Sequence, residues 1–166
     1  MDASALLTAA AGAIVGAVLA FGAMLWRLRL QERRGVRAVT REILVNVTEL
    51  TMASKLGYCP SGWFHYEVWE RQATSSAHVL PWRAYVVTAW FYGALKKLED
   101  MHRQFHTEGC TGILSEEARK ALDGVAELVL QLKDVWKNPD LEKGLREIEE
   151  RALAVPSTPR PLEQAE

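Results

Sequence analysis

The sequence predicts an all-α protein, with an N-terminal transmembrane helix followed by a small cytoplasmic helical bundle. Three observations indicate this class. Residues 5–26 form a run of 22 residues without a charge. Apolar residues recur with helical spacing through most of the remaining chain, and no segment shows the polar–apolar alternation of a strand. The predicted segments are a short N-terminal end (1–4), the transmembrane helix (5–26), a basic juxtamembrane helix continuing into the domain (27–56), the bundle (57–153) and a disordered tail (154–166).

The uncharged run from Ala5 to Trp26 has the length of a membrane span. At about 1.5 Å per residue it makes a helix of roughly 33 Å, against a hydrocarbon core of about 30 Å. Trp26 at its end suits the membrane–water interface. Two alternatives remain open. A secretory signal peptide would have a basic start and a shorter apolar run, and a buried globular helix of this length normally shows a polar face.

A cluster of arginines follows the run directly, and only Glu32 opposes it. The cluster consists of Arg27, Arg29, Arg33, Arg34, Arg37 and Arg41. The positive-inside rule then places the C-terminal domain in the cytoplasm and the N-terminus outside, in a single-pass protein of a cell membrane. Beyond setting topology, Arg27, Arg29, Arg33, Arg34 and Arg37 are candidates for contact with anionic lipid. Nucleic acid is the least favoured partner, because the whole chain carries a net charge of −1 and keeps no broad basic face.

Small residues recur every fourth position in the apolar run. Thr8, Gly12, Gly16 and Ala20 share one helix face, and Gly12 with Gly16 forms a GxxxG motif that lets two membrane helices approach closely. The sequence therefore predicts a homo-oligomer formed through this face. The alternative is that an Ala- and Gly-rich span contains such a row by composition alone.

The remaining helices follow from periodicity and capping signals. We expect a helix to about Lys55, a short one over 63–77 and a long one after Pro81, because proline fits a first turn. In the long helix, apolar residues at positions 87, 91, 94, 98, 101 and 105 form the clearest core stripe. Its uncharged stretch, 84–95, fits a central buried helix or one lying at a membrane surface. A loop over 106–114 precedes a helix capped by Ser115, and Asn138-Pro139-Asp140 ends that helix and begins another.

This layout resembles a loose group of small bacterial and phage membrane-anchored proteins of unknown function. The resemblance rests on Glu42-Ile-Leu-Val-Asn46, then Trp69, then Tyr92 with Leu95 and Leu98, and it covers roughly residues 36–105. In that group a membrane helix runs into a helix with a Glu-x-x-x-Asn pattern, followed by a short helix with Trp and a long one with Tyr. The resemblance implies this architecture and attaches no catalytic residue to it.

Candidate chemistry is sparse. His102, His106 and Cys110 are spaced by four, so a continuous helix would place them, with Glu99, near one zinc ion. Gly109 argues against that continuity, and unremarkable surface histidines are the simpler interpretation. Cys110 in a glycine-flanked loop is a weak nucleophile candidate that would need a histidine base. We therefore expect no catalytic residue, cofactor or metal.

Aromatic residues are dense between positions 58 and 92. They fit the core where the second and third helices meet, with a few rim aromatics left for binding a partner. The leading hypothesis is a non-enzymatic, membrane-tethered helical interaction module that associates with itself, with membrane lipid and with an unknown protein. The alternatives are a small phage-type protein that oligomerises in the bilayer and changes its permeability, and a metal-dependent enzyme.

Overall fold

A computed structural model describes residues 3–56, 64–107 and 116–154, and within these ranges the chain forms five helices and no strand. The predicted all-α class is confirmed. Within the helices, the side chains of residues 3–14, 56 and 104–107 lie outside the description. The predicted Ser115 cap and the tail after 154 also fall outside the described residues, so both stay predictions.

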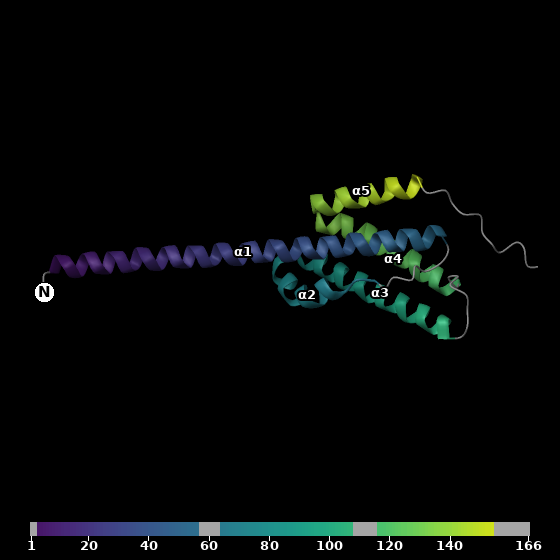
Figure 1. Cartoon of the computed structure of the whole chain (residues 1–166), viewed down its shortest axis with the longest axis horizontal. Coiled ribbons are helices and arrows are strands. Elements are labelled where there is room, and N and C mark those ends of the chain that lie inside the picture. Colours follow the sequence, from purple (N-terminus) through teal and green to yellow (C-terminus); the bar gives the residue numbers. More distant parts are fainter. Residues whose placement is uncertain (1–2, 57–63, 108–115, 155–166) are drawn as a thin grey trace, which may run out of the picture.

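Helix α1, Ala3–Leu56, is continuous over 54 residues. Its C-terminal half packs into the bundle through a stripe at positions 39, 43, 47 and 50, all buried. Its N-terminal half projects away from the other helices (Figure 1). From Val15, where the description of side chains begins, every side chain to Arg34 is exposed, and Gly35 is the first buried residue after them. The helix is therefore divided at Gly35 into a projecting half and a packed half.

Helices α2, Glu67–Val79, and α3, Trp82–Thr107, meet at a sharp turn. Pro81 sits just before α3 and its carbonyl accepts the first helical bond, from the backbone NH of Tyr85 at 3.0 Å. In α3, Val87, Phe91 and Leu98 of the predicted stripe are buried, whereas Ala94 and Met101 are half-buried. The predicted start of the second helix at residue 63 was wrong, because the helix begins at Glu67.

Helices α4, Glu116–Trp136, and α5, Pro139–Ala154, are joined by the predicted Asn138 cap. The side-chain carbonyl of Asn138 accepts hydrogen bonds from the backbone NH groups of Asp140 at 2.9 Å and Leu141 at 3.4 Å. Lys137 adopts a left-handed backbone conformation with φ of 45°, which turns the chain. The amide of Asn138 also donates to Thr40 Oγ1 at 3.3 Å, so this turn is tied to α1.

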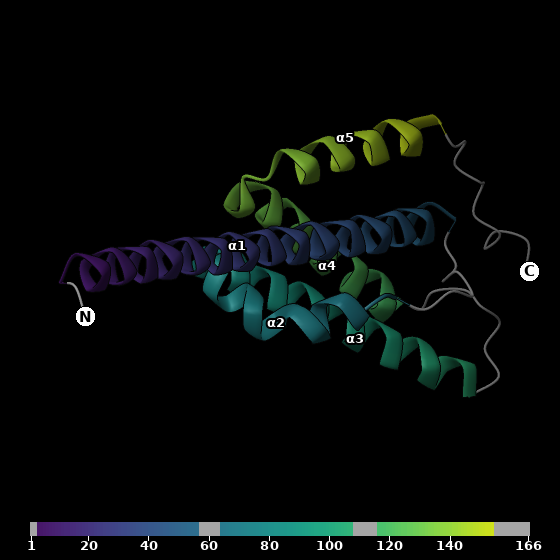
Figure 2. The same cartoon turned by 60° about the vertical axis from the view of Figure 1, so that its left-hand side comes forward.

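The packed half of α1 lies at the centre of the bundle. Helices α2 and α3 lie on one side of it and α5 on the other, while α4 packs mainly against α3 (Figures 1 and 2). Helix α5 approaches closely at Gly144, where an added Cβ would lie 2.6 Å from Leu44 Cδ2. A side chain at this position would push α5 away from α1.

In the part of the chain that the structure describes, no helix is long and apolar enough to cross a membrane. The structure therefore confirms the helical bundle and gives no support of its own to the predicted transmembrane helix.

Candidate functional site

The most distinctive feature of the bundle is a pair of buried polar side chains on α1. Glu42 and Asn46 are four residues apart, so they share one helix face. Their exposed fractions are 6% and 0%. Both point toward the start of α2, where backbone groups need partners. We call Glu42, Asn46, Trp69 and Tyr92 the Glu42 clamp.

Asn46 holds the chain just before α2. Its amide nitrogen donates to the carbonyl of His65 at 2.7 Å, and its carbonyl oxygen accepts from the backbone NH of His65 at 2.7 Å. The side-chain amide thus satisfies both backbone groups of one residue, as a neighbouring strand would do. This pairing keeps His65 out of helical bonding, which explains why the helix does not begin at residue 63.

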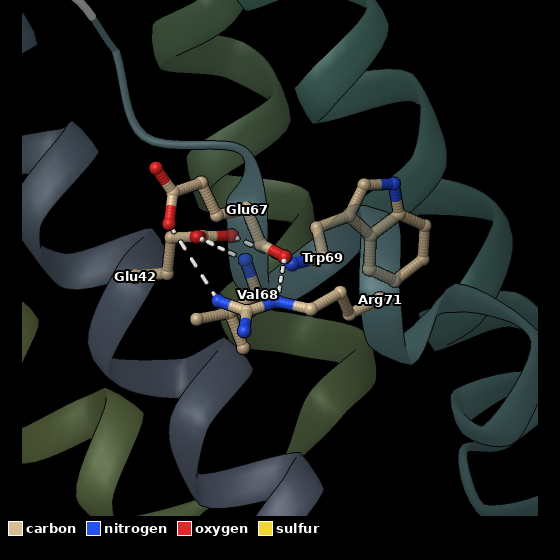
Figure 3. Close-up of polar contacts among 5 residues, drawn as sticks. All are labelled: Glu42, Glu67, Val68, Trp69 and Arg71. Atoms are coloured by element: carbon tan, nitrogen blue, oxygen red, sulfur yellow. Dashed lines mark hydrogen bonds and ion pairs between the residues drawn. The ribbon is translucent and has the colours of Figure 1, made fainter.

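Glu42 caps α2 from another helix (Figure 3). Its Oε2 accepts from the backbone NH of Val68 at 2.7 Å, and its Oε1 accepts from the backbone NH of Trp69 at 2.9 Å. The first NH groups of a helix have no partner within it, and Tyr66, the residue at the cap position, makes no side-chain capping bond. A negative charge here also complements the helix dipole. Glu42 therefore performs the task that a local cap residue normally performs.

Tyr92 on α3 completes the clamp. Its hydroxyl donates to Glu42 Oε1 at 2.8 Å, and its ring stacks on Trp69 with centroids 5.1 Å apart and an interplanar angle of 4°. Burial raises the pKa of the Tyr92 hydroxyl, and the hydrogen bond to Glu42 and its charge raise the pKa further. The hydroxyl thus remains a proton donor, and the clamp connects α1, α2 and α3.

A second tyrosine–carboxylate pair lies nearer the surface. The Tyr66 hydroxyl donates to Glu99 Oε2 at 2.6 Å, and burial followed by this bond raises the pKa of Tyr66. Lys96 lies 5.6 Å from the centre of the Tyr66 ring and pairs with Glu70 at 2.8 Å. These contacts fix the α2–α3 pair from outside the core.

Within the clamp, the Glu42 carboxylate joins three helices by hydrogen bonds. All three donors around the Glu42 carboxylate belong to the protein itself. In the described residues no buried side-chain polar atom lacks a hydrogen-bond partner. The three contacts hold the Glu42 carboxylate against α2 and α3.

Of the three predicted metal candidates, only His102 has a described side chain. His102 lies half-buried on α3, while the His106 side chain and Cys110 fall outside the described residues. No group of three or more potential metal ligands occurs among the residues that are described.

The predicted lipid and self-association residues lie on α1, and all of them precede Gly35 except Arg37, which lines a hollow between α1 and α5. Arg27, Arg29, Arg33, Arg34 and Arg37 are all exposed. Ala20 is exposed, and an added Cβ at Gly16 would meet nothing within 4 Å. The side chains of Thr8 and Gly12 fall outside the description.

The aromatic residues divide as the sequence indicated. Phe64, Trp69, Phe91 and Tyr92 are buried, whereas Trp82 and Trp90 are 71% and 60% exposed. The clamp itself was not predicted from the residues. The resemblance had singled out its four residues, Glu42, Asn46, Trp69 and Tyr92, without saying how they meet, and Glu42 shares a helix face with the apolar core stripe of α1.

An apolar groove lies between α1, α4 and α5. Its volume is about 550 Å³, and its walls include Leu50, Val129 and Ile148. The groove is open to solvent, and its rim carries acids and lysines in equal number: Lys55, Asp123, Lys133 and Glu149.

No protein-family model, curated protein or solved structure matches this chain.

Proposed function

We propose that this protein is a membrane-tethered helical interaction module that associates with itself. The observation that carries the proposal is the division of α1 at Gly35. One continuous helix has a half whose described side chains, Val15 to Arg34, are all exposed, and a half at the centre of a bundle. Such a helix joins an external attachment rigidly to a folded domain.

The projecting half of α1 has the surface of an attachment segment. Val18, Leu19, Phe21 and Trp26 are 63–68% exposed. Soluble monomers seldom expose contiguous apolar surface beyond a few hundred Å², and this apolar run extends back to Ala5. A lipid bilayer is the partner that suits this segment best, because the run has the length of a membrane span and ends on a tryptophan followed by arginines.

The exposed arginines support one orientation. They begin at Arg27, directly after Trp26. The proposal therefore places the bundle in the cytoplasm, next to anionic lipid headgroups that attract arginine by about 1 kcal/mol per residue. A reporter that is active only outside the cytoplasm, fused to the C-terminus, should stay inactive; activity would reverse this orientation.

The bundle has the properties of a binding module. The clamp gives it a defined shape, and the groove between α1, α4 and α5 offers apolar walls with a charged rim, the pattern of many interaction surfaces.

Membrane attachment is tested by flotation of the full chain with lipid vesicles after an alkaline wash. Each replacement of an apolar residue by Arg in mid-span should cost about 3 kcal/mol of insertion. The double variant Val15→Arg, Val18→Arg, near the middle of the 5–26 run, should therefore stay in the alkaline wash instead of floating with the vesicles. Leu153→Arg changes an equally apolar residue, 84% exposed on α5, and should float like the parent. Equal flotation of both variants would refute the tether.

Self-association is tested by crosslinking the full chain in vesicles. The proposal expects a defined small oligomer that weakens when Gly12 and Gly16 are both changed to Leu. An unchanged oligomer would exclude this helix face. Large rings accompanied by vesicle leakage would instead support a membrane-permeabilising role.

A further inference from the structure

The turn between α2 and α3 presents an exposed tryptophan next to an arginine. We call residues 78–83 the α2–α3 corner. Trp82 is 71% exposed, and His78, Pro81 and Arg83 are exposed beside it. Trp82 stacks on Tyr85 with centroids 5.9 Å apart, so its ring is held in place while its outer surface faces solvent.

The corner lies at the end of the bundle nearest the projecting half of α1. Helix α2 runs antiparallel to α1, because Asn46 contacts His65, Glu42 contacts Trp69, and Gly35 approaches Gln72. From Gln72, the helix continues for seven residues to Val79, about 10 Å further in the same direction. Figures 1 and 2 both show the α2–α3 turn at this end of the bundle. The corner is therefore brought toward the arginine-bearing stretch of α1.

The depth fits a membrane surface if α1 spans the bilayer. Gly35 follows Trp26 by nine residues, or about 14 Å of helix. Because α2 runs back along α1, it extends up to about 10 Å from the level of Gly35 toward the level of Trp26. Each headgroup layer is roughly 5–8 Å thick, so Trp82 reaches the level of the headgroups when the helix tilts by the usual 20° or so toward the corner.

The charge around the corner favours an anionic surface. The 28 residues from Arg71 to Leu98 contain no Asp or Glu, although the chain holds 21 acids in total. Of its four basic residues, Arg83 lies in the corner, whereas Arg71 and Lys96 pair with Glu67 and Glu70 and Lys97 lies about four turns further along α3. A segment with exposed Trp, basic residues and no acids has the composition of an interfacial membrane contact.

We propose that the α2–α3 corner is a second membrane contact, in which Trp82 enters the headgroup region of an anionic bilayer and Arg83 pairs with lipid phosphate. This inference rests on the proposed tether through α1. Two contacts, one along α1 and one at the corner, fix how the bundle is turned about the α1 axis. The groove between α1, α4 and α5 then keeps a constant direction relative to the membrane.

The test measures tryptophan quenching in the full chain, reconstituted in phosphatidylcholine vesicles with or without phosphatidylglycerol. Brominated phosphatidylcholine quenches only tryptophans that touch lipid. Comparison with Trp26→Phe, Trp82→Phe and Trp90→Phe assigns the quenched emission to single positions. Trp90 is the matched control, because it is 60% exposed on the same helix and two turns, about 12 Å, further along α3.

We expect Trp26→Phe and Trp82→Phe each to remove a quenched component, and Trp90→Phe to remove an unquenched one. Without phosphatidylglycerol, quenching at Trp82 should fall by at least half while quenching at Trp26 stays unchanged. Quenching at Trp26 but not at Trp82 would leave the tether standing and overturn the corner contact. Absence of quenching at Trp26 would overturn the tether and this inference together. Protection of Trp82 from aqueous iodide without quenching by brominated lipid would overturn the inference in favour of a protein contact.

Discussion

Replacing Glu42 should destabilise the bundle more than replacing any exposed acid. In Glu42→Ala the backbone NH groups of Val68 and Trp69 and the hydroxyl of Tyr92 lose their acceptor. A buried donor left without a partner costs about 1–3 kcal/mol. Val68 is only half-buried, so water can replace part of its bond, whereas Trp69 and Tyr92 are 9% and 3% exposed. The expected loss is about 3–5 kcal/mol of unfolding free energy, a large share of the stability of a small domain.

The assay is equilibrium urea unfolding of the full chain in detergent micelles, followed by near-ultraviolet circular dichroism. That signal reports on the stacked rings of Trp69 and Tyr92, which separate when the bundle unfolds. Glu42→Gln keeps the size of the side chain but turns one acceptor into a donor, and we expect it to lose about 1.5–3 kcal/mol.

Glu67→Gln is the matched control. Glu67 begins α2 beside the clamp, its side chain is 87% exposed, and it pairs with Arg71 at 3.6 Å (Figure 3). An exposed pair of this kind contributes little, so the variant should unfold within about 0.5 kcal/mol of the parent. A Glu42→Ala variant as stable as the parent would refute the capping role. An equal loss in Glu67→Gln would assign the effect to the charge at the start of α2 rather than to the clamp.

Three further variants test packing and ionisation in the same unfolding assay. Gly144→Ala should destabilise the bundle by about 1–3 kcal/mol, because the added Cβ overpacks against Leu44. Gly124→Ala is the control: its Cβ would meet open space, so the higher helix propensity of Ala should stabilise the bundle by about 0.5–1 kcal/mol. A Gly144→Ala variant more stable than Gly124→Ala would contradict the close approach of α5 to α1. Phe91→Ala removes a fully buried ring and should cost about 3–5 kcal/mol, and unchanged unfolding would show that this stripe is not core. Because the pKa of Tyr92 is raised in the folded state, its contribution is complete below the unfolded pKa of about 10 and is lost as the pH rises above that value. Tyr92→Phe should reduce the fall in stability above pH 10 by up to about 1.4 kcal/mol per pH unit, and equal slopes in parent and variant would count against the buried hydroxyl.

Much of the fold was predictable because helices carry their signals locally. The stripe containing Val87, Phe91 and Leu98 required only a period of 3.6 residues. The join between α4 and α5 was predictable because Asn138 caps its own helix and Pro139 fits the first turn. In both cases, the residues that determine the structure are neighbours in the sequence.

The start of α2 was not predictable for the opposite reason. Its cap comes from Glu42, 26 residues before Val68, and the preceding turn is held by Asn46, 19 residues before His65. Every residue except proline has a backbone NH group, so the sequence does not show which of these groups bond to Glu42 and Asn46. The place of Glu42 on an apolar helix face indicated that a buried carboxylate would need hydrogen-bond donors, but it did not indicate which residues supply them.

The unbroken course of α1 also gives its two halves a common angular phase. Eighteen residues complete five helical turns, so Gly16 lies in line with Arg34, which is exposed just before the bundle begins. Two chains meeting along the Gly16 line would meet again at Arg34, about 100° around the helix from the α2 contact at Gly35. The two bundles would then lie on the outside of the helix pair. Inserting a single residue between Trp26 and Arg34 would rotate each bundle about the α1 axis by about 100°.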